Sequence, residues 1–234
     1  MRTLLVWILL FPAFIASGQT TADKKPRKGY LGVYFGPSFP IGNFGDNDFN
    51  NDEAGFAARG VQYAVMEFGV KFVPNFGIAA SIRGSSIPMD VQYLADQYAL
   101  EYGGQFTVES SRWGFGGLHV GPVFSFPIGK LEIDLRLMTG LMFAVSPELT
   151  VTQNTTGQSD NQNSEVGTSL ALSLGIGLKY HISDRFTILA VAEYQRARPT
   201  FIIEQYPGNN YQSTTVYQNV SSISPMLGIG LRIF

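Results

Sequence analysis

The residues of this chain that could do chemistry are charged side chains spaced two apart within apolar stretches. Glu132, Asp134 and Arg136 show the pattern best, because each is flanked by leucine or isoleucine. Charges on the inner face of a narrow structure must be paired, and they could alternatively line a polar pore or a proton path. Near-equal numbers of acids and bases favour a mutually neutralising plug. The predicted set comprises Glu67, Lys71, Arg83, Glu132, Asp134, Arg136, Lys179, Glu193 and Arg232.

The two histidines are the natural starting points for a catalytic site. His181-Ile182-Ser183, with Glu193 beyond it, resembles the His-x-Ser arrangement of lipid A deacylase barrels. A serine nucleophile needs a base within reach and a third group that orients the base. Ser183 falls in a predicted short turn, on the side opposite to lipid A chemistry, and His119 has no serine two residues later. We therefore predict no catalytic residues and no enzyme activity.

An oxygen-rich segment follows the first apolar stretch and resembles a calcium loop. Its candidate ligands are Asp46, Asp48, Asn50 and Asp52. An EF-hand loop requires glycine at its sixth position and glutamate at its twelfth, where this chain has Asn51 and Ala57. The segment therefore fails the motif, and a flexible acidic loop is the favoured reading over a looser Ca²⁺ site. We predict no cofactor and no metal centre.

Eight stretches with a period of two must position these side chains. The alternation is clearest in residues 170–181, where leucine, isoleucine and tyrosine alternate with serine, glycine, Lys179 and His181. Such alternation predicts β-strands with one apolar face. The expected strands are residues 29–40, 60–73, 76–83, 109–126, 131–143, 170–181, 186–195 and 227–233, with a bulge expected near Gly116-Gly117 in the fourth.

The connections between these strands alternate in length. Turns after the second, fourth and sixth strands span a few residues, whereas segments 41–59, 87–108, 146–165 and 205–215 are long and polar. Bacterial outer-membrane barrels have an even number of strands, short periplasmic turns and long outer loops. The fold class predicted is therefore all-β: an eight-stranded antiparallel transmembrane β-barrel of the outer-membrane type, with both chain ends in the periplasm. Helix-permissive residues at 91–102 predict a short helix on one outer loop.

Composition is consistent with an envelope protein. Arg2, the apolar run 4–15 and the small residues Ala16-Ser17-Gly18 predict a signal peptide over residues 1–18. A periplasmic tail at 19–28 and a barrel at 29–234 would follow. The full chain has 16 basic and 18 acidic residues, and cleavage of the signal peptide removes one base, Arg2. The mature chain would then have 15 bases, 18 acids and a net charge of −3, which argues against a basic nucleic-acid-binding surface. The absence of cysteine excludes disulfides, a lipoprotein anchor and thiolate metal sites.

A soluble lipocalin-like barrel or sandwich would also alternate, so the choice depends on which face points outwards. The non-apolar face is mostly glycine, serine and alanine with single charges, as a narrow lumen requires. Aromatic residues gather at the expected strand ends, as at membrane interfaces. They are Phe72, Phe76, Phe124, Phe126, Tyr180 and Phe186 at the periplasmic end, and Phe39, Tyr63, Trp113, Phe143 and Tyr194 at the outer end. With Phe234 closing the chain, these features favour the membrane barrel.

The chain resembles the small outer-membrane β-barrel proteins of Bacteroidota, described as porin-like or PorT-like. The resemblance is carried by residues 29–37, Gly-Tyr-Leu-Gly-Val-Tyr-Phe-Gly-Pro, and 227–234, Leu-Gly-Ile-Gly-Leu-Arg-Ile-Phe. It implies a bacterial outer-membrane location and insertion by the barrel-assembly machinery. Phe234 departs from the family pattern, because Ile233, Leu231 and Ile229 have the opposite parity.

The function expected is that of a monomeric outer-membrane barrel with a plugged lumen and a structural or surface-interaction role. Alternatives are a narrow porin-like channel and, less favoured, a lipid-modifying outer-membrane enzyme. Expected partners are outer-membrane lipid, lipopolysaccharide, the insertion machinery and an envelope protein, with no nucleic acid. Segments 41–59, 87–109 and 146–165 hold 11 of the 18 acids against Arg59 alone. Such loops either serve solubility, bridge divalent cations to lipopolysaccharide phosphates, or contact a basic partner.

Overall fold

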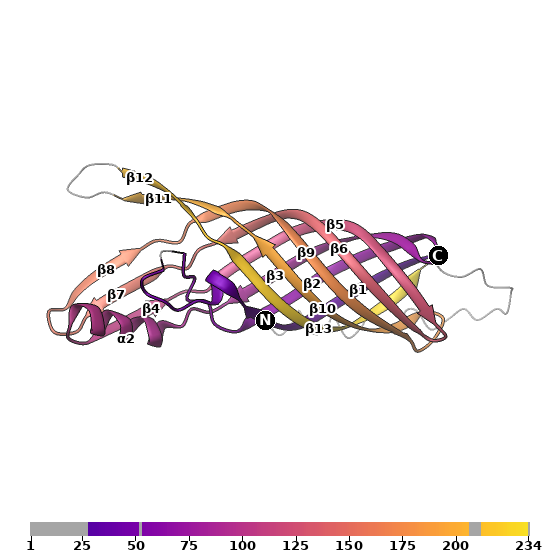
Figure 1. The fold of residues 1–234 in the computed structure, drawn as a ribbon, viewed down its shortest axis with the longest axis horizontal. Coiled ribbons are helices and arrows are strands. Elements are labelled where there is room, and N and C mark those ends of the chain that lie inside the picture. Colours follow the sequence, from indigo (N-terminus) through magenta and orange to yellow (C-terminus); the bar gives the residue numbers. More distant parts are fainter. Residues whose placement is uncertain (1–27, 52, 206–211, 234) are drawn as a thin grey trace, which may run out of the picture.

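The computed structural model describes residues 28–51, 53–205 and 212–233, and within them eight long strands close into an antiparallel barrel (Figure 1). Each strand pairs with its neighbour along the barrel, and β13 returns to pair with β1 from Gly29↔Ile233 to Pro40↔Ser222. The predicted fold class is confirmed. The barrel strands are β1 (Gly29–Pro40), β2 (Gly60–Val73), β3 (Phe76–Ile87), β5 (Trp113–Ile128), β6 (Leu131–Val145), β9 (Val166–His181), β10 (Phe186–Ala197) and β13 (Val220–Ile233).

The two faces of the barrel wall differ as the alternation predicted. In β9, Leu172, Leu174 and Ile176 are exposed on the outside, whereas Ser173 is buried in the lumen. Glycine on the inner face makes room for larger neighbours: a Cβ on Gly69 would lie 2.2 Å from the ring of Tyr30. The exterior is therefore almost continuously apolar and the interior is crowded and polar.

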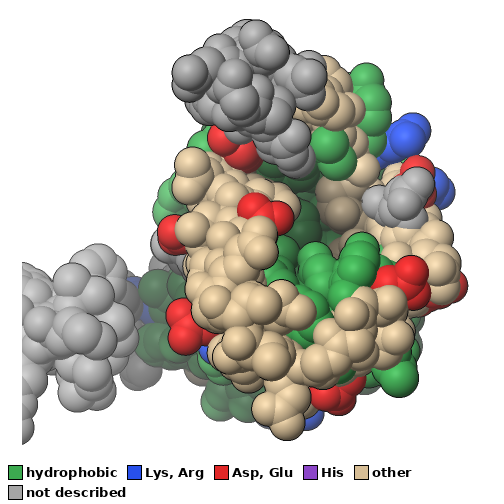
Figure 2. Space-filling view, turned by 90° about the vertical axis from the view of Figure 1, so that its left-hand side faces the viewer, with side chains coloured by type: hydrophobic (Ala, Val, Ile, Leu, Met, Phe, Trp, Pro, Cys, Tyr) green, Lys and Arg blue, Asp and Glu red, His purple; other side chains and the backbone are tan. Residues whose placement is uncertain are grey.

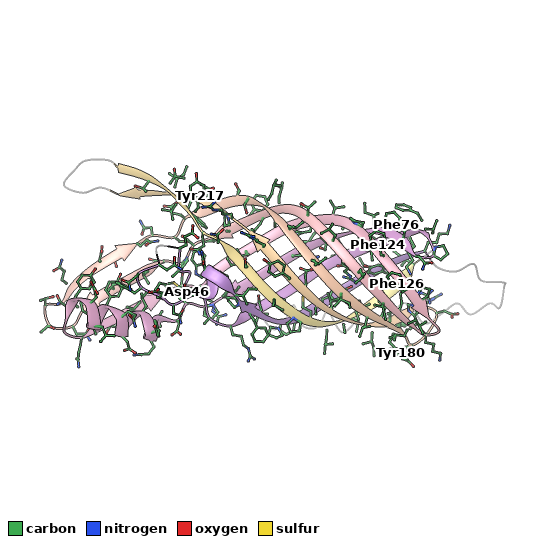
Figure 3. All side chains as sticks on the ribbon, in the orientation of Figure 1. Asp46, Phe76, Phe124, Phe126, Tyr180 and Tyr217 are labelled. Carbon is green, nitrogen blue, oxygen red and sulfur yellow. The ribbon has the colours of Figure 1, made fainter. Side chains whose placement is uncertain are left out.

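The short-turn end of the barrel carries a collar of exposed aromatic side chains, which lies at the right of Figure 3. The rings of Phe72 and Phe76 are 6.3 Å apart, and those of Phe76 and Phe124 are 5.2 Å apart. The six predicted members are all exposed on the outside: Phe72, Phe76, Phe124, Phe126, Tyr180 and Phe186. Phe39, Phe143 and Tyr194 are exposed nearer the other end, where the side chain of Tyr63 lies outside the described residues.

The opposite end of the barrel bears folded connections rather than loops alone (Figure 1). The 3-10 helix η2 (Gly42–Gly45) follows β1, and α2 (Val91–Tyr102) confirms the predicted helix. Asp90 caps α2 by accepting a hydrogen bond from the backbone of Tyr93 at 3.2 Å. Short strands form the rest: β4 (Phe106–Ser110), β7 (Leu149–Gln153), β8 (Gln158–Gln162), β11 (Thr200–Gln205) and β12 (Gln212–Tyr217). Among the described residues, no helix is long and apolar enough to cross a membrane.

The strand predictions were wrong in several details. The last strand begins at Val220 rather than at residue 227, and β9 begins at Val166 rather than at residue 170. The expected fourth strand, 109–126, is split into β4 and β5, because β4 pairs with β7 in a separate three-stranded sheet β4-β7-β8. No bulge occurs at Gly116-Gly117, where both ladders keep their register; the irregularities fall in β2, between Ala64 and Met66 and between Lys71 and Val73. Segment 146–165 contains the hairpin β7-β8, whose second strand is entirely polar and is held by backbone pairing.

Several sequence predictions fall outside the described residues. The signal peptide 1–18 and most of the tail 19–28 precede Lys28, and Phe234 follows Ile233. Asp52 and residues 206–211 are the internal gaps. The predictions for these segments stay predictions.

The inside-outside assignment can be tested at the middle of β9. Leu174 is 59% exposed on the exterior, and its neighbour Ser173 is 1% exposed. We expect Leu174→Arg to lower the unfolding free energy by about 2–4 kcal/mol, because a cation would face the bilayer midplane. Urea titrations of folding in lipid vesicles measure this, with Leu174→Ala as the matched control. Equal costs for the two variants would contradict the assignment.

Candidate functional site in the barrel lumen

The centre of the lumen is built around Arg136, whose guanidinium is fully buried. Its Nη1 donates to both carboxylate oxygens of Glu67, at 2.8 and 3.1 Å, and its Nη2 donates to the hydroxyl of Tyr34 at 3.0 Å. The hydroxyls of Tyr34 and Tyr30 in turn donate to Glu67 Oε1 at 2.9 and 2.6 Å. Strands β1, β2 and β6 therefore meet across the lumen through one hydrogen-bonded group.

A second group continues towards the short-turn end. Asp134 forms ion pairs with Lys179 at 2.7 Å and with Arg136 at 3.4 Å, and it accepts a hydrogen bond from Ser125 at 2.7 Å. Lys179 also reaches Glu132 at 3.5 Å, and Glu132 forms a close ion pair with Lys71. Acids and bases thus alternate along a continuous chain from the barrel centre to its mouth.

A third group lies towards the loop end. Arg83 forms a close ion pair with Glu193, and it also donates to the hydroxyls of Ser81 at 2.7 Å and Ser173 at 3.2 Å. Both partners are nearly inaccessible, so each supplies the other's neutralising charge. Arg232, the remaining residue of the predicted set, is half-buried at the mouth.

Charge in the interior is balanced among the described residues. Four bases face four acids: Lys71, Arg83, Arg136 and Lys179 against Glu67, Glu132, Asp134 and Glu193. A buried charge without a partner is costly, whereas a paired and hydrogen-bonded one is tolerated. The buried charges are therefore paired within neutral groups, and the interior carries no excess of one sign.

An aromatic cluster fills the lumen at its loop end, and sequence reasoning missed it. Phe44 of η2 is 0% exposed, and its ring meets those of Trp113 and Phe115 edge-on at 5.7 and 5.6 Å. Trp113 Nε1 donates to the carbonyl of Gly55, which holds the first loop in the mouth. We call this group the aromatic plug: Phe44, Ile87, Trp113, Phe115, Met142 and Phe201.

The prediction that Trp113 belongs to the outer aromatic girdle was wrong. Trp113 shares the parity of Phe115, His119 and Val123, all of which point inwards. The predicted bulge concealed this parity, and counting back from the clear alternation at 118–126 would have revealed it. No comparable signal marks Phe44, because it lies in a connection without strand periodicity.

The lumen leaves little empty space among these residues. A cavity of about 10 Å³ lies between Tyr34, Glu67, Arg83 and Glu193, and another of about 10 Å³ lies beside His119 and Gln195. A third, of about 30 Å³, lies at the short-turn mouth beside Lys71 and Lys179. A cavity needs roughly 10–15 Å³ to hold one water molecule.

The histidines are not placed for nucleophilic catalysis. His181 Nδ1 lies 3.0 Å from the hydroxyl of Thr187, while the hydroxyl of Ser183 accepts hydrogen bonds from the turn backbone. Glu193 is paired with Arg83 elsewhere in the lumen. His119 is buried, and neither of its ring nitrogens has a hydrogen-bond partner among the described residues.

The candidate calcium ligands bind groups of their own loop. Asp46 accepts hydrogen bonds from Asn51 at 2.8 Å and from the backbone of Asp48, and these bonds lower its pKa, the first most strongly. Asp48 accepts from Asn50. Asp52 lies outside the described residues, within which no group of three histidine or acidic side chains could hold a metal ion.

Comparison with known proteins places the fold. No protein-family model matches the chain, and no curated protein matches its sequence. Among solved structures, Neisserial surface protein A is 12% identical over 88% of this chain and 97% of its own, with a TM-score of 0.50. OprG from Pseudomonas aeruginosa is 13% identical over 88% and 96%, also with a TM-score of 0.50. Ail of Yersinia pestis is 17% identical over 89% and 100%, with a TM-score of 0.46.

At such low identity these comparisons establish the fold alone, which is that of the small eight-stranded outer-membrane barrels. The exterior surface gives independent physical evidence for a membrane location. An apolar surface on all eight strands, with every strand edge paired, suits hydrocarbon and not water. The chain is an integral β-barrel protein of the bacterial outer membrane.

The central network predicts a large penalty for removing one partner. We expect Arg136→Ala to lower the unfolding free energy by about 3–5 kcal/mol, because Glu67 loses its buried counter-charge. Urea titrations in lipid vesicles measure it. The matched control is Arg198→Ala: Arg198 lies 3.7 Å from Glu53, both are exposed, and its loss should cost about 0–1 kcal/mol. Similar costs for the two variants would show that the lumen pair carries no special stability.

Proposed function

We propose that this protein is a non-enzymatic barrel with a closed lumen, whose task is structural support of the outer membrane and interaction at its outer surface. The observation that carries the proposal is the filled interior. The aromatic plug closes the loop end, the neutral network fills the centre, and the cavities between them have room for about one water molecule each.

The surface role is supported by the folded loop end. Helix α2 packs on the sheet β4-β7-β8 around Leu94, Ala95 and Val108, which are all buried. The rings of Phe49 and Tyr98, 5.1 Å apart, extend this small core. A core of its own holds these connections in a fixed shape, as a recognition surface requires.

The loop end is also strongly acidic. Figure 2 views it directly and shows acidic side chains around the rim, with hydrophobic side chains gathered in the hollow between the loops. Described acids at this end include Asp48, Asp90, Asp96, Glu101, Glu109, Glu148, Asp160 and Glu165. Acidic loops suit contact with a basic partner, or with lipopolysaccharide phosphates through divalent cations.

Further parts of the proposal rest on sequence. The proposed mature protein begins after residue 18, is inserted by the barrel-assembly machinery, acts as a monomer, and keeps residues 19–28 and both chain ends in the periplasm. Its proposed place is among the PorT-like barrels of Bacteroidota, on the terminal motifs at 29–37 and 227–234. The narrow channel is the alternative that a measurement can separate from the closed barrel.

Orientation can be measured because the chain has no native cysteine. Thr155 lies in the exposed turn between β7 and β8, and Asn75 lies in the exposed turn between β2 and β3. We expect a membrane-impermeant thiol reagent to label Thr155→Cys on whole cells and to spare Asn75→Cys. Both should react after the cells are lysed, which controls for accessibility. Labelling of position 75 alone on whole cells would show that the barrel has the opposite orientation.

Closure of the lumen can be measured by electrical recording. We expect the purified wild-type barrel to give no stable single-channel steps in a planar bilayer. The double variant Phe44→Ala/Trp113→Ala removes part of the aromatic plug at the loop end only. It should also give no single-channel steps, because the charged residues still fill the centre of the lumen. Reproducible ohmic steps from the wild type would overturn the closed lumen and favour the channel.

A further inference from the structure

The short-turn end of the barrel gathers basic residues in facing pairs. Backbone hydrogen bonds join Lys71 N to the Lys28 carbonyl at 2.8 Å, His181 N to the Lys130 carbonyl at 2.9 Å, and Arg232 N to the Arg185 carbonyl at 2.7 Å. Three strand pairs therefore end with a basic residue on each strand. The corresponding end of the β3-β5 pair is neutral, with Asn75 opposite Ser125. We call these six residues the basic mouth: Lys28, Lys71, Lys130, His181, Arg185 and Arg232.

Facing basic residues repel each other, so this arrangement calls for counter-charge. Among the described residues, the acids at this end are Glu132 and Asp184. Glu132 already forms ion pairs with both Lys71 and Lys179. Lys28 and Lys130 are exposed, and neither forms an ion pair with any described residue. Lys28 and Lys130 therefore leave positive charge at the exposed end of the barrel, available to an external anion.

Shape restricts where that anion can bind. Lys28, Lys71, His181 and Arg232 converge on the hollow of about 30 Å³ at the mouth. Lys71 is already paired with Glu132 there, so the room for an external anion is at the exposed rim. Lys28 and Lys130 lie on opposite sides of that rim, next to β1 and β6, so each can meet a different anion.

The rim lies at a particular depth relative to the bilayer. Phe72 and Phe186 of the aromatic collar directly follow Lys71 and Arg185 in the chain, and Tyr180 directly precedes His181. Figure 3 shows the collar at this end of the barrel, through Phe76, Phe124, Phe126 and Tyr180. Aromatic collars mark the level where hydrocarbon gives way to headgroups, and long basic side chains extend from there to lipid phosphates.

We propose that the basic mouth binds the phosphate groups of anionic phospholipids in the leaflet on the short-turn side. In the proposed orientation, on which this inference rests, that leaflet faces the periplasm. The acidic loop end would repel the same anionic lipids, so the two ends of the barrel would favour membrane surfaces of different charge. Negatively charged membrane surfaces attract juxtamembrane basic residues by the same physics.

Native mass spectrometry of the folded mature barrel can measure lipid retention directly. The probes are phosphatidylglycerol, which is anionic, and phosphatidylcholine, which is zwitterionic. We expect the wild type to retain phosphatidylglycerol in preference. The double variant Lys28→Gln/Lys130→Gln should reduce that preference by roughly tenfold. Lys28→Arg/Lys130→Arg keeps the charge and should keep the preference.

The matched control is Arg59→Gln/Arg112→Gln, which removes two positive charges from the loop end and should leave the preference unchanged. Excess inorganic phosphate separates a lipid headgroup from free phosphate as the ligand. Release of the lipid by inorganic phosphate, absence of preference in the wild type, or equal loss in the control would each overturn the proposal. Failure of the proposed orientation would appear instead as cysteine labelling at position 75, with lipid retention unchanged.

Discussion

The fold depends on one constraint: a chain that crosses a bilayer must satisfy every polar group from within. Closing the sheet satisfies the backbone, since each strand is paired on both sides. It also encloses eight charged side chains, and all of them except Lys71 are at most 7% exposed. These side chains neutralise one another. The single guanidinium of Arg136, for example, contacts Glu67, Asp134 and Tyr34. The network therefore holds β1, β2 and β6 together across the lumen, beyond what the backbone ladder provides.

The interior changes character along the barrel axis. At the loop end the wall residues are apolar, and Phe44 enters from a connection to complete the plug. In the centre, tyrosine hydroxyls and serines supply the hydrogen bonds that the carboxylates need. At the short-turn end the bases outnumber the acids, and the surplus charge reaches the rim. The proposed closed interior and the two oppositely charged ends are the properties by which this barrel would act on its surroundings.

Much of this could be predicted, because a strand in a two-sided environment records its orientation at every second residue. The strand 60–73 and the helix 91–102 were predicted with the bounds that the structure shows. All nine residues of the predicted lumen set lie on strands of the barrel wall. Where periodicity failed, so did the prediction: Phe44 lies in a connection, and Trp113 was misplaced by a bulge that does not exist.

The sequence by itself determined the class of protein, the existence of the eight barrel strands and the inward face of most of them, because these are local properties of a period-two pattern. Only the tertiary structure decided which acid meets which base. Asp134 is two residues from Arg136 on the same strand, whereas Glu67 is 69 residues away on β2 and only barrel closure brings it within 2.8 Å. It likewise decided that a loop phenylalanine fills the mouth and that β8 pairs without one apolar residue. Such contacts depend on register and closure, which are properties of the assembled sheet.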